Sequence, residues 1–514
     1  MSAPPPSHSE IEQAVFGVSR PWYRYLVIGF ALAALMLVAG RVTYGCHRHS
    51  VDAYLRDEIT LGGTPRFDPP HPIDPAALAR IDLERVHAEL FPDWTIAASR
   101  PDRGGAAERE RTAFIDLRVA VEADPNLGAL LDELRQHVLS GEHAARGLRM
   151  IYLTWAWSHY LDQQGKPYIL DGNVIVGARN LYYAKSYRVL GDSAARVGQA
   201  SYRLRLLNRI DQTNVIEQYL GQARPHREGA LVVIDRTRDF AIEHVWPLLD
   251  EDNEGWLRPI DFAFAAGVRA EARAQLPAVA LALLRATARD RELLVRTRRF
   301  MHARRDCGSD LIVNWIPLDG FSEEDADWFT RVAARDTDRP CPRVKQEEAR
   351  QLVEASARLR AAEGLGDAVG ALVAWLARDV ALHEARHVAD FALARAHERP
   401  LPCRGCLEET PRQTRAELSA YLASLAWSEA PTLSFYQACR AVARERGPHH
   451  EALAFVLAKL DQRCESGPPA DLTARARALE LELFGRSDEI TLPDDFPETL
   501  PLHDDGPPVT VENR

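Results

Sequence analysis

The spacing of apolar and polar residues along the chain predicts mainly amphipathic helices. Residues 75–90 and 126–162 place apolar side chains three and four positions apart, which is typical of helices with one buried face. Segments between residues 168 and 246 are rich in Val, Ile and Tyr in partial alternation, broken by Gly and Asp, and predict a small antiparallel sheet. Helical spacing returns from residue 259 onward. The pattern therefore predicts an α+β fold that is predominantly α-helical.

One apolar segment has the character of a membrane helix. Residues 25–40 contain no charged residue, and Arg24 and Arg41 flank them. As a helix this segment rises roughly 24 Å, and the flanking arginines and aromatic residues extend its span toward the hydrocarbon thickness of about 30 Å. A cleaved signal peptide and a lipoprotein anchored at Cys46 are the alternatives, but the preceding stretch is long and polar and no clear cleavage box follows. We expect a single transmembrane helix at residues 23–45.

The predicted elements divide the chain into six parts. These are a polar N-terminal tail at 1–22, the transmembrane helix at 23–45, a Pro-rich spacer at 46–75, an α+β domain at 76–250, a helical domain at 251–486 and an acidic, disordered tail at 487–514. The acidic tail has eight acids and one arginine, so it contributes −7 of the net charge of −11. The rest of the chain is nearly neutral, which argues against a nucleic-acid-binding protein.

The number and positions of the cysteines indicate in which cellular compartment the protein folds. Cys46 lies beside the predicted membrane helix, and the other cysteines lie in the C-terminal half. An even set of six is typical of disulfides in an exported domain, although reduced core thiols are the alternative. Cys403 and Cys406 are expected to form a local disulfide. High Arg and Ala contents indicate a GC-rich bacterial genome. The arginines on either side of the membrane segment are balanced and do not decide its orientation, so the cysteine set is the reason to expect a single-pass cell-membrane protein whose body lies on the periplasmic or extracytoplasmic side.

The sequence H-E-A-R-H at residues 383–387 carries the candidate chemistry. His383 and His387 continue a helical stripe of apolar residues, so both imidazoles are expected on a buried helix face. A metal ion satisfies two imidazoles one turn apart better than they satisfy each other, because one ring must donate where the other accepts. Core histidines with other partners are the alternative. Glu384 lies where a general base would take a proton from zinc-activated water during peptide hydrolysis.

The residues that follow this motif exclude one class of metallopeptidase and resemble another. A metzincin would have a glycine and a third histidine where Asp390 and Leu393 stand. The remaining pattern, over about residues 366–427, resembles the gluzincin metallopeptidases, the thermolysin-like clan, in which a glutamate on a following helix completes the zinc site. The resemblance implies Glu417 as the third ligand, on a helix expected to begin near residue 410.

Other residues near the motif remain candidates. Asp390 is a competing ligand on the same helix face, although a role in orienting an imidazole N–H is the preferred interpretation. The further acidic candidates are Glu408, Glu409 and Glu429, and the candidates for stabilising an oxyanion are Tyr421, Tyr436, His449 and His450.

These observations predict a membrane-anchored zinc metallopeptidase that acts on a peptide or protein substrate. One zinc ion would be held by His383, His387 and Glu417, with Glu384 as the catalytic base. The alternative is a non-catalytic, membrane-anchored envelope binding protein whose zinc site is structural or degenerate. The two hypotheses differ in coordination, because a catalytic zinc keeps an open position whereas a structural zinc is closed by a fourth protein ligand.

Overall fold

The computed structural model describes residues 67–98, 106–139, 146–175, 181–211, 220–224, 229–251, 257–291, 330–331, 334, 346–397, 401–407, 410–442 and 448–500. The predicted N-terminal tail and the predicted membrane helix at 23–45 lie outside these residues. Within the described ranges, no helix is both long enough and apolar enough to cross a bilayer.

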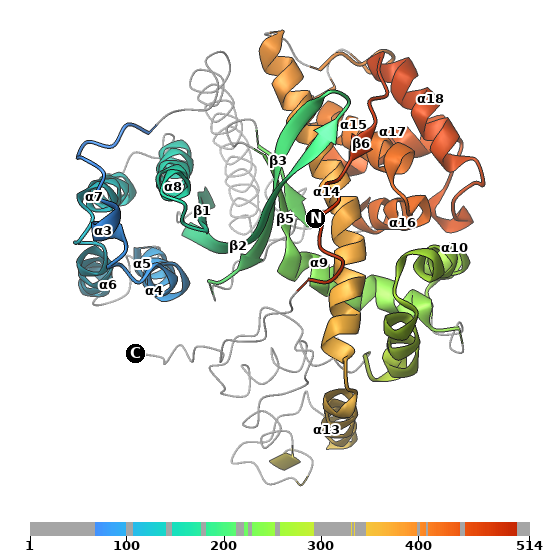
Figure 1. Cartoon of the computed structure of the whole chain (residues 1–514), viewed down its shortest axis with the longest axis horizontal. Helices are drawn as coiled ribbons and strands as arrows, with labels where there is room; N and C mark the ends of the chain where they lie inside the picture. The colour runs from blue at the N-terminus through green and yellow to red at the C-terminus, as the bar shows by residue number, and fades with distance from the viewer. Residues whose placement is uncertain are drawn as a thin grey trace, which may run out of the picture.

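The first described part is a group of helices with its own hydrophobic core. Its elements are α3 (Pro75–Leu78), α4 (Leu83–Arg85), η1 (Val86–Leu90), α5 (Phe91–Ala98), α6 (Ala106–Ala120), α7 (Pro125–Leu139) and α8 (Arg146–Gln163). On α7, Leu127, Leu130, Leu134 and Val138 are buried at three- and four-residue spacing, as predicted. They share one core with Trp157 of α8. These helices lie beside the β1 end of the sheet (Figure 1).

The sheet is mixed, which corrects the prediction of an antiparallel one. Its strands are β1 (Tyr168–Ile175), β2 (Leu181–Val197), β3 (Ala200–Arg209), β4 (Gly221–Gln222), β5 (Ala230–Val233) and β6 (Ile490–Thr491). Their order is β1-β2-β3-β5-β4, and β6 pairs with β2 outside this path. β3 and β5 are parallel, whereas the other pairs are antiparallel. A parallel pair requires a crossover connection, which turn signals in the sequence do not reveal.

Residues 234–249 are helical, although their Val and Ile content favoured an extended segment. They form α9 (Ile234–Phe240), η2 (Ala241–Val245) and η3 (Trp246–Leu249). Buried positions along them include Ile234, Thr237, Ala241 and Val245, which are three or four residues apart. That spacing places them on one face of a helix. Residues 237–242 and 244–246 are all buried, so the segment is enclosed on every side, and tertiary packing rather than β-propensity decides the structure here.

A long helix, α14 (Leu365–Ala396), forms the centre of the helical part. Its 32 residues extend about 48 Å. α14 packs against β2, β3, β5 and α9, and also against α15. Figure 1 shows it between the sheet and the group α15–α18. The other elements are α10 (Pro259–Gln275), helical residues 278–291, α13 (Gln346–Ala361), α15 (Arg412–Trp427), α16 (Pro431–Val442), α17 (Pro448–Leu460), η5 (Cys464–Ser466) and α18 (Leu472–Phe484).

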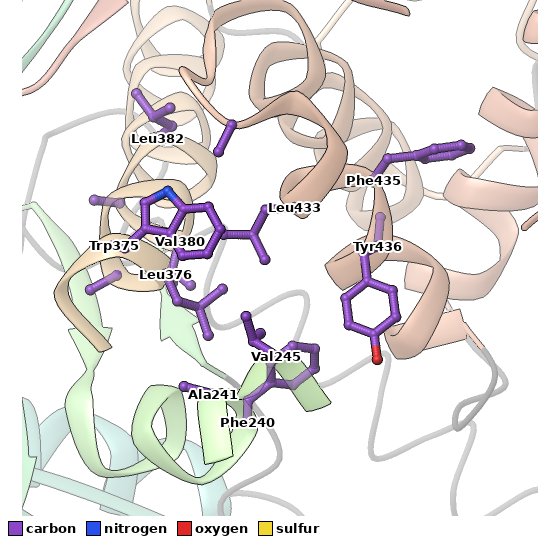
Figure 2. Close-up of a cluster of buried hydrophobic side chains, with 14 of the residues drawn as sticks. Phe240, Ala241, Val245, Trp375, Leu376, Val380, Leu382, Leu433, Phe435 and Tyr436 are labelled. Atoms are coloured by element: carbon purple, nitrogen blue, oxygen red, sulfur yellow. The ribbon is translucent and has the colours of Figure 1, made fainter. Parts of the chain in front are cut away.

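The hydrophobic core beside α14 joins distant parts of the chain (Figure 2). Trp375 and Leu376 of α14 lie in one continuous cluster with Val245 of η2 and Leu433 of α16. All four side chains are buried. Because close-packed interiors resist deformation, this packing makes α14 a rigid support for the residues that it carries at 383–387.

Residues 487–500 are ordered, which corrects the prediction of a disordered tail over 487–514. β6 pairs with β2, and Phe496 and Leu500 are 3% and 2% exposed. The Leu500 N–H donates to the Gly370 carbonyl of α14 at 3.2 Å. The many acidic residues of this segment led to the prediction of disorder. The apolar residues between them, including Phe496 and Leu500, nevertheless pack onto the fold. Residues 501–514 lie outside the described part of the chain.

Two disulfides occur among the described residues. Cys403 and Cys406 are joined in the connection between α14 and α15, which confirms the predicted local disulfide. Cys439 of α16 is joined to Cys464 of η5. The remaining cysteines, Cys46, Cys307 and Cys341, lie outside the described ranges.

Asp379 of α14 is expected to make stability depend on pH. Burial raises the pKa of this carboxyl to about 7, although hydrogen bonds from Ser434 and Ser428 oppose the increase, and the charge of Glu271 adds to it. Because folding raises this pKa, the protonated form favours the folded state and stability falls as pH rises through 7. Relative to the wild type, Asp379→Asn should therefore gain about 2–3 kcal/mol in unfolding free energy between pH 5 and pH 8.

Chemical denaturation at both pH values measures this difference. Asp367→Asn, which changes an exposed acid on the same helix, is a control that should keep the pH dependence of the wild type. An Asp379→Asn variant whose gain is the same at pH 5 and pH 8 would contradict the expectation.

Candidate metal centre

His383 and His387 lie one turn apart on the buried stretch of α14. The apolar residues before them, Leu372, Leu376 and Val380, are at most 2% exposed, as the predicted stripe requires. Residues 368–377 are buried on every face of the helix, however, and Phe391 and Ala394 at the end of the stripe are only partly buried. The histidine side chains are 14% and 7% exposed. Their rings meet edge to face, and their Nε2 atoms lie 3.1 Å apart. The two imidazoles therefore converge on one point.

α15 brings the third predicted ligand to the same point. The helix begins at Arg412, directly after Pro411, close to the expected start. Glu417 Oε2 lies 3.3 Å from His383 Nε2 and 3.4 Å from His387 Nε2. The ligand atoms of these three residues lie within 4.8 Å of one another.

The spacing of these atoms fits a divalent ion such as zinc. Zinc binds histidine nitrogen at about 2.0–2.1 Å and carboxylate oxygen at about 2.0–2.2 Å in tetrahedral geometry, so two ligand atoms on one ion lie about 3.3 Å apart. The three observed separations are 3.1, 3.3 and 3.4 Å. Glu417 Oε2 is buried with no well-aligned hydrogen-bond donor among the described residues. One ion between the three atoms would satisfy all of them.

The charges of the site favour a cation at this point. Burial lowers the pKa of His387, but attraction to Glu417 outweighs burial and raises the pKa to about 9. Burial lowers the pKa of His383 to about 4. Burial acts to raise the pKa of the Glu417 carboxyl, but the charge of His387 outweighs burial and holds this pKa well below its usual range. Glu417 is thus a buried anion, and a metal ion would compete with the proton on His387.

Glu384 is buried beside the converging atoms and lies against β4. The side chain is 6% exposed. A Cβ on Gly221 of β4 would lie 2.5 Å from Glu384 Cγ and 2.7 Å from its Oε1, so the strand backbone covers the carboxyl directly. Burial raises the pKa of Glu384 to about 7, although the charge of His387 opposes the increase. A carboxyl with a pKa near neutrality can both accept and return a proton.

Substituting Gly221 should disturb Glu384 without removing a ligand. The methyl group of Gly221→Ala would meet Glu384 and also Val380, at 2.8 Å. We expect the unfolding free energy to fall by about 1–3 kcal/mol, any hydrolytic activity to fall, and metal affinity to stay unchanged. Denaturation, a peptidase assay and metal titration measure the three effects.

Gly366→Ala provides the matched control, because a Cβ on that residue of α14 would meet nothing within 4 Å. It should leave activity and metal affinity as they are. A Gly221→Ala variant with full stability and full activity would show that β4 does not fix the position of Glu384.

Asp390 does not belong to the group of converging ligand atoms. It is 1% exposed, and its carboxylate pairs with Arg386 and Arg486. The buried Nδ1 of His387 has no hydrogen-bond partner among the described residues, so Asp390 does not orient that ring in the way the sequence suggested. Of the other acidic candidates, Glu429 is exposed, and Glu408 and Glu409 lie outside the described ranges.

Two residues that the sequence did not distinguish lie at the site. His449 of α17 places Nδ1 3.0 Å from Glu417 Oε2 and 3.2 Å from the Tyr421 hydroxyl. The Tyr421 ring meets His383 edge to face. Tyr421 lies one turn after Glu417, so helical spacing from that glutamate was a usable signal. His449 had none, because only tertiary packing brings α17 to α15.

The remaining two oxyanion candidates lie elsewhere. The Tyr436 hydroxyl is in the core and donates to Asp261 at 2.8 Å. His450 is exposed at the start of α17. Neither belongs to the group of side chains around Glu417.

Comparison with known proteins adds no relative: no family model matches the chain, and no curated protein and no solved structure matches it.

Proposed function

We propose that this protein is a zinc-dependent metallopeptidase. The observation that carries the proposal is the convergence of His383, His387 and Glu417 at the spacing that a tetrahedral ion requires, with Glu384 beside them on the same helix. The motif and the glutamate helix are those of the gluzincin pattern. Access to the site is supported by the exposed fractions of His383 and His449, 14% and 21%, against 8% for Glu417.

In this proposal Glu384 moves the proton. Bound zinc would act as a Lewis acid and lower the pKa of water to about 7. The Glu384 carboxylate accepts a proton from the attacking water and returns it to the nitrogen of the departing amine. His449 Nδ1 lies 3.0 Å from Glu417 Oε2 and 3.2 Å from the Tyr421 hydroxyl, so both side chains are close enough to donate hydrogen bonds to the charge that develops on the peptide carbonyl oxygen.

The position of His449 bears on the rival hypothesis of a closed structural site. A fourth protein ligand is required for that hypothesis. His449 Nδ1 faces Glu417 and Tyr421, and it is not one of the three groups whose ligand atoms converge. The geometry therefore favours three protein ligands and one open position.

The proposal also includes anchoring through residues 23–45 and a body outside the cytoplasm, acting on peptides or proteins. The two disulfides among the described residues support this placement, because disulfides persist in oxidising compartments.

Metal analysis of the purified full-length chain tests the function. We expect one zinc per chain, hydrolysis of an unfolded protein labelled with a fluorophore, loss of that activity after a chelator and its return with zinc. Failure to bind zinc would overturn the proposal. Bound zinc without hydrolysis, together with a His449→Phe variant that binds zinc as weakly as His383→Phe, would instead establish the structural site.

A further inference from the structure

Arg386, between the two histidines in sequence, is one of the largest fully buried side chains of the described chain. It is 0% exposed, and Nε donates to Ser419 Oγ at 2.9 Å. Its guanidinium pairs with Asp390 at 3.3 Å and with Glu480 at 2.8 Å. A third acid, Asp488, lies 3.7 Å away. Arg386 therefore contacts α14 itself, α15, α18 and the segment that precedes β6.

A second arginine continues this cluster. Arg486 pairs with Asp390 and lies 3.4 Å from Asp488. Ser487 Oγ donates to Glu480 at 2.7 Å. Burial lowers the pKa of Arg486 and raises that of Glu480. The side chains of Arg386 and Glu480 are 0% exposed and that of Asp390 is 2% exposed, whereas Arg486 and Asp488, at 20% and 38%, lie at the edge of the cluster.

A cluster of buried charges is weak evidence of a contribution to stability. Desolvation of each ion costs several kcal/mol, and well-packed apolar residues in place of a buried ion pair are often as stable or more stable. A hydrogen bond adds geometric specificity, because it fixes the distance and the angle between the two groups that it joins, and the hydrogen bond from Arg386 Nε to Ser419 Oγ joins α14 to α15. Here the joined groups are the two helices that carry the proposed metal ligands.

The hydrogen bond between Arg386 and Ser419 lies close to the predicted metal ligands. Ser419 lies two residues after Glu417 on α15, and Arg386 lies one residue before His387 on α14. A hydrogen bond between side chains thus joins the residue before His387 to the residue two positions after Glu417. Because metal–ligand bond lengths vary by only about 0.2 Å in sound sites, a small shift between α14 and α15 would change the affinity for the ion.

We propose that Arg386, held by Asp390 and Glu480, is a positioning residue that sets the spacing of Glu417 from the two histidines. This inference rests on the proposed metal site and adds to it the 486–488 segment as part of the support. Arg386 itself touches no ligand atom.

The test compares Arg386→Met and Arg386→Lys with the wild type in the full-length chain. Arg477→Met is the matched control, because Arg477 also joins α18 to α15, through the Ala426 carbonyl at 2.9 Å, but far along the helix from Glu417. Three quantities are measured for each: the zinc dissociation constant by chelator competition, the visible absorption bands of the Co²⁺ derivative, and the denaturation midpoint.

We expect Arg386→Met to weaken zinc binding by about 10-fold or more and to alter the Co²⁺ bands, with partial recovery in Arg386→Lys. Arg477→Met should lower the midpoint while leaving affinity and bands unchanged. Equal zinc affinity and identical bands in Arg386→Met would overturn the positioning role while the metal site stands. Absence of zinc binding in the wild type would instead overturn the proposed function itself. If Arg386→Met does not fold, Arg386→Lys alone decides the question by the same two readouts.

Discussion

Glu384→Gln is expected to slow peptide hydrolysis by about 10²–10⁴-fold, the range that general acid–base catalysis contributes. The amide keeps the size of the carboxyl and the packing against Gly221 of β4, but it cannot accept a proton. Zinc should remain bound at the wild-type stoichiometry, because Glu384 is not one of the converging ligand groups. Initial rates on an unfolded protein, measured beside the zinc content, separate the two effects.

Stability provides a second readout for this variant. Burial raises the pKa of Glu384 to about 7, so the folded state favours the protonated carboxyl and loses stability as pH rises through 7. In metal-free protein, Glu384→Gln should therefore be at least as stable as the wild type at pH 8. A loss of activity with a matching loss of stability would point to misfolding rather than to a missing base.

Glu429→Gln is the matched control for the same chemical change, because Glu429 is exposed at the end of α15. It should retain full activity. If Glu384→Gln retains full activity as well, Glu384 is not the base and the catalytic assignment fails.

Glu417→Ala is expected to abolish zinc binding. The substitution removes the carboxylate that lies within 3.4 Å of both histidine Nε2 atoms and the anion that raises the pKa of His387. A ligand at 100 times its dissociation constant stabilises the folded state by about 2.7 kcal/mol. Zinc at that concentration should raise the unfolding free energy of the wild type by this amount and should not stabilise the variant.

Glu451→Ala serves as the control for Glu417→Ala. Glu451 of α17 accepts a hydrogen bond from Thr414 of α15 at 3.0 Å, so it lies at the contact between these two helices, and it is not one of the converging ligand groups. Its variant should keep the stabilisation by zinc. Zinc that stabilises Glu417→Ala as strongly as the wild type would show that the ion binds elsewhere.

Most of the candidate site could be predicted from the sequence, because three of its residues lie close together on one helix. His383, Glu384 and His387 occupy one helix whose apolar spacing is explicit, and Glu417 follows from the resemblance and a proline helix start. His449 was not readable, because its place depends on how α17 packs against α15. The role of Arg386 could not be predicted for a related reason: its partners Glu480 and Asp488 come from a different part of the chain.

The fold was predictable to the level of its helices and the presence of a sheet. Strand direction was not, because the β3–β5 pair is parallel and depends on the connection between the strands. The segment 487–500 was misread because acidic composition was taken as a sign of disorder. Its packing depends on Ile490, Phe496 and Leu500, three apolar residues spaced six and four positions apart, which is too few to define a period in the sequence.

The pairing of β6 with β2 has a consequence for synthesis. Ile490 pairs with Val197, so about 300 residues must be made before this contact can form. Contacts between such distant residues form late, since the intervening chain must first be ordered. Asp390 and Arg386 receive Arg486 and Asp488 from the same late segment. A growing chain therefore carries its two histidines long before their support is complete, and full affinity for the ion is expected only once residues 486–491 have been made and have packed.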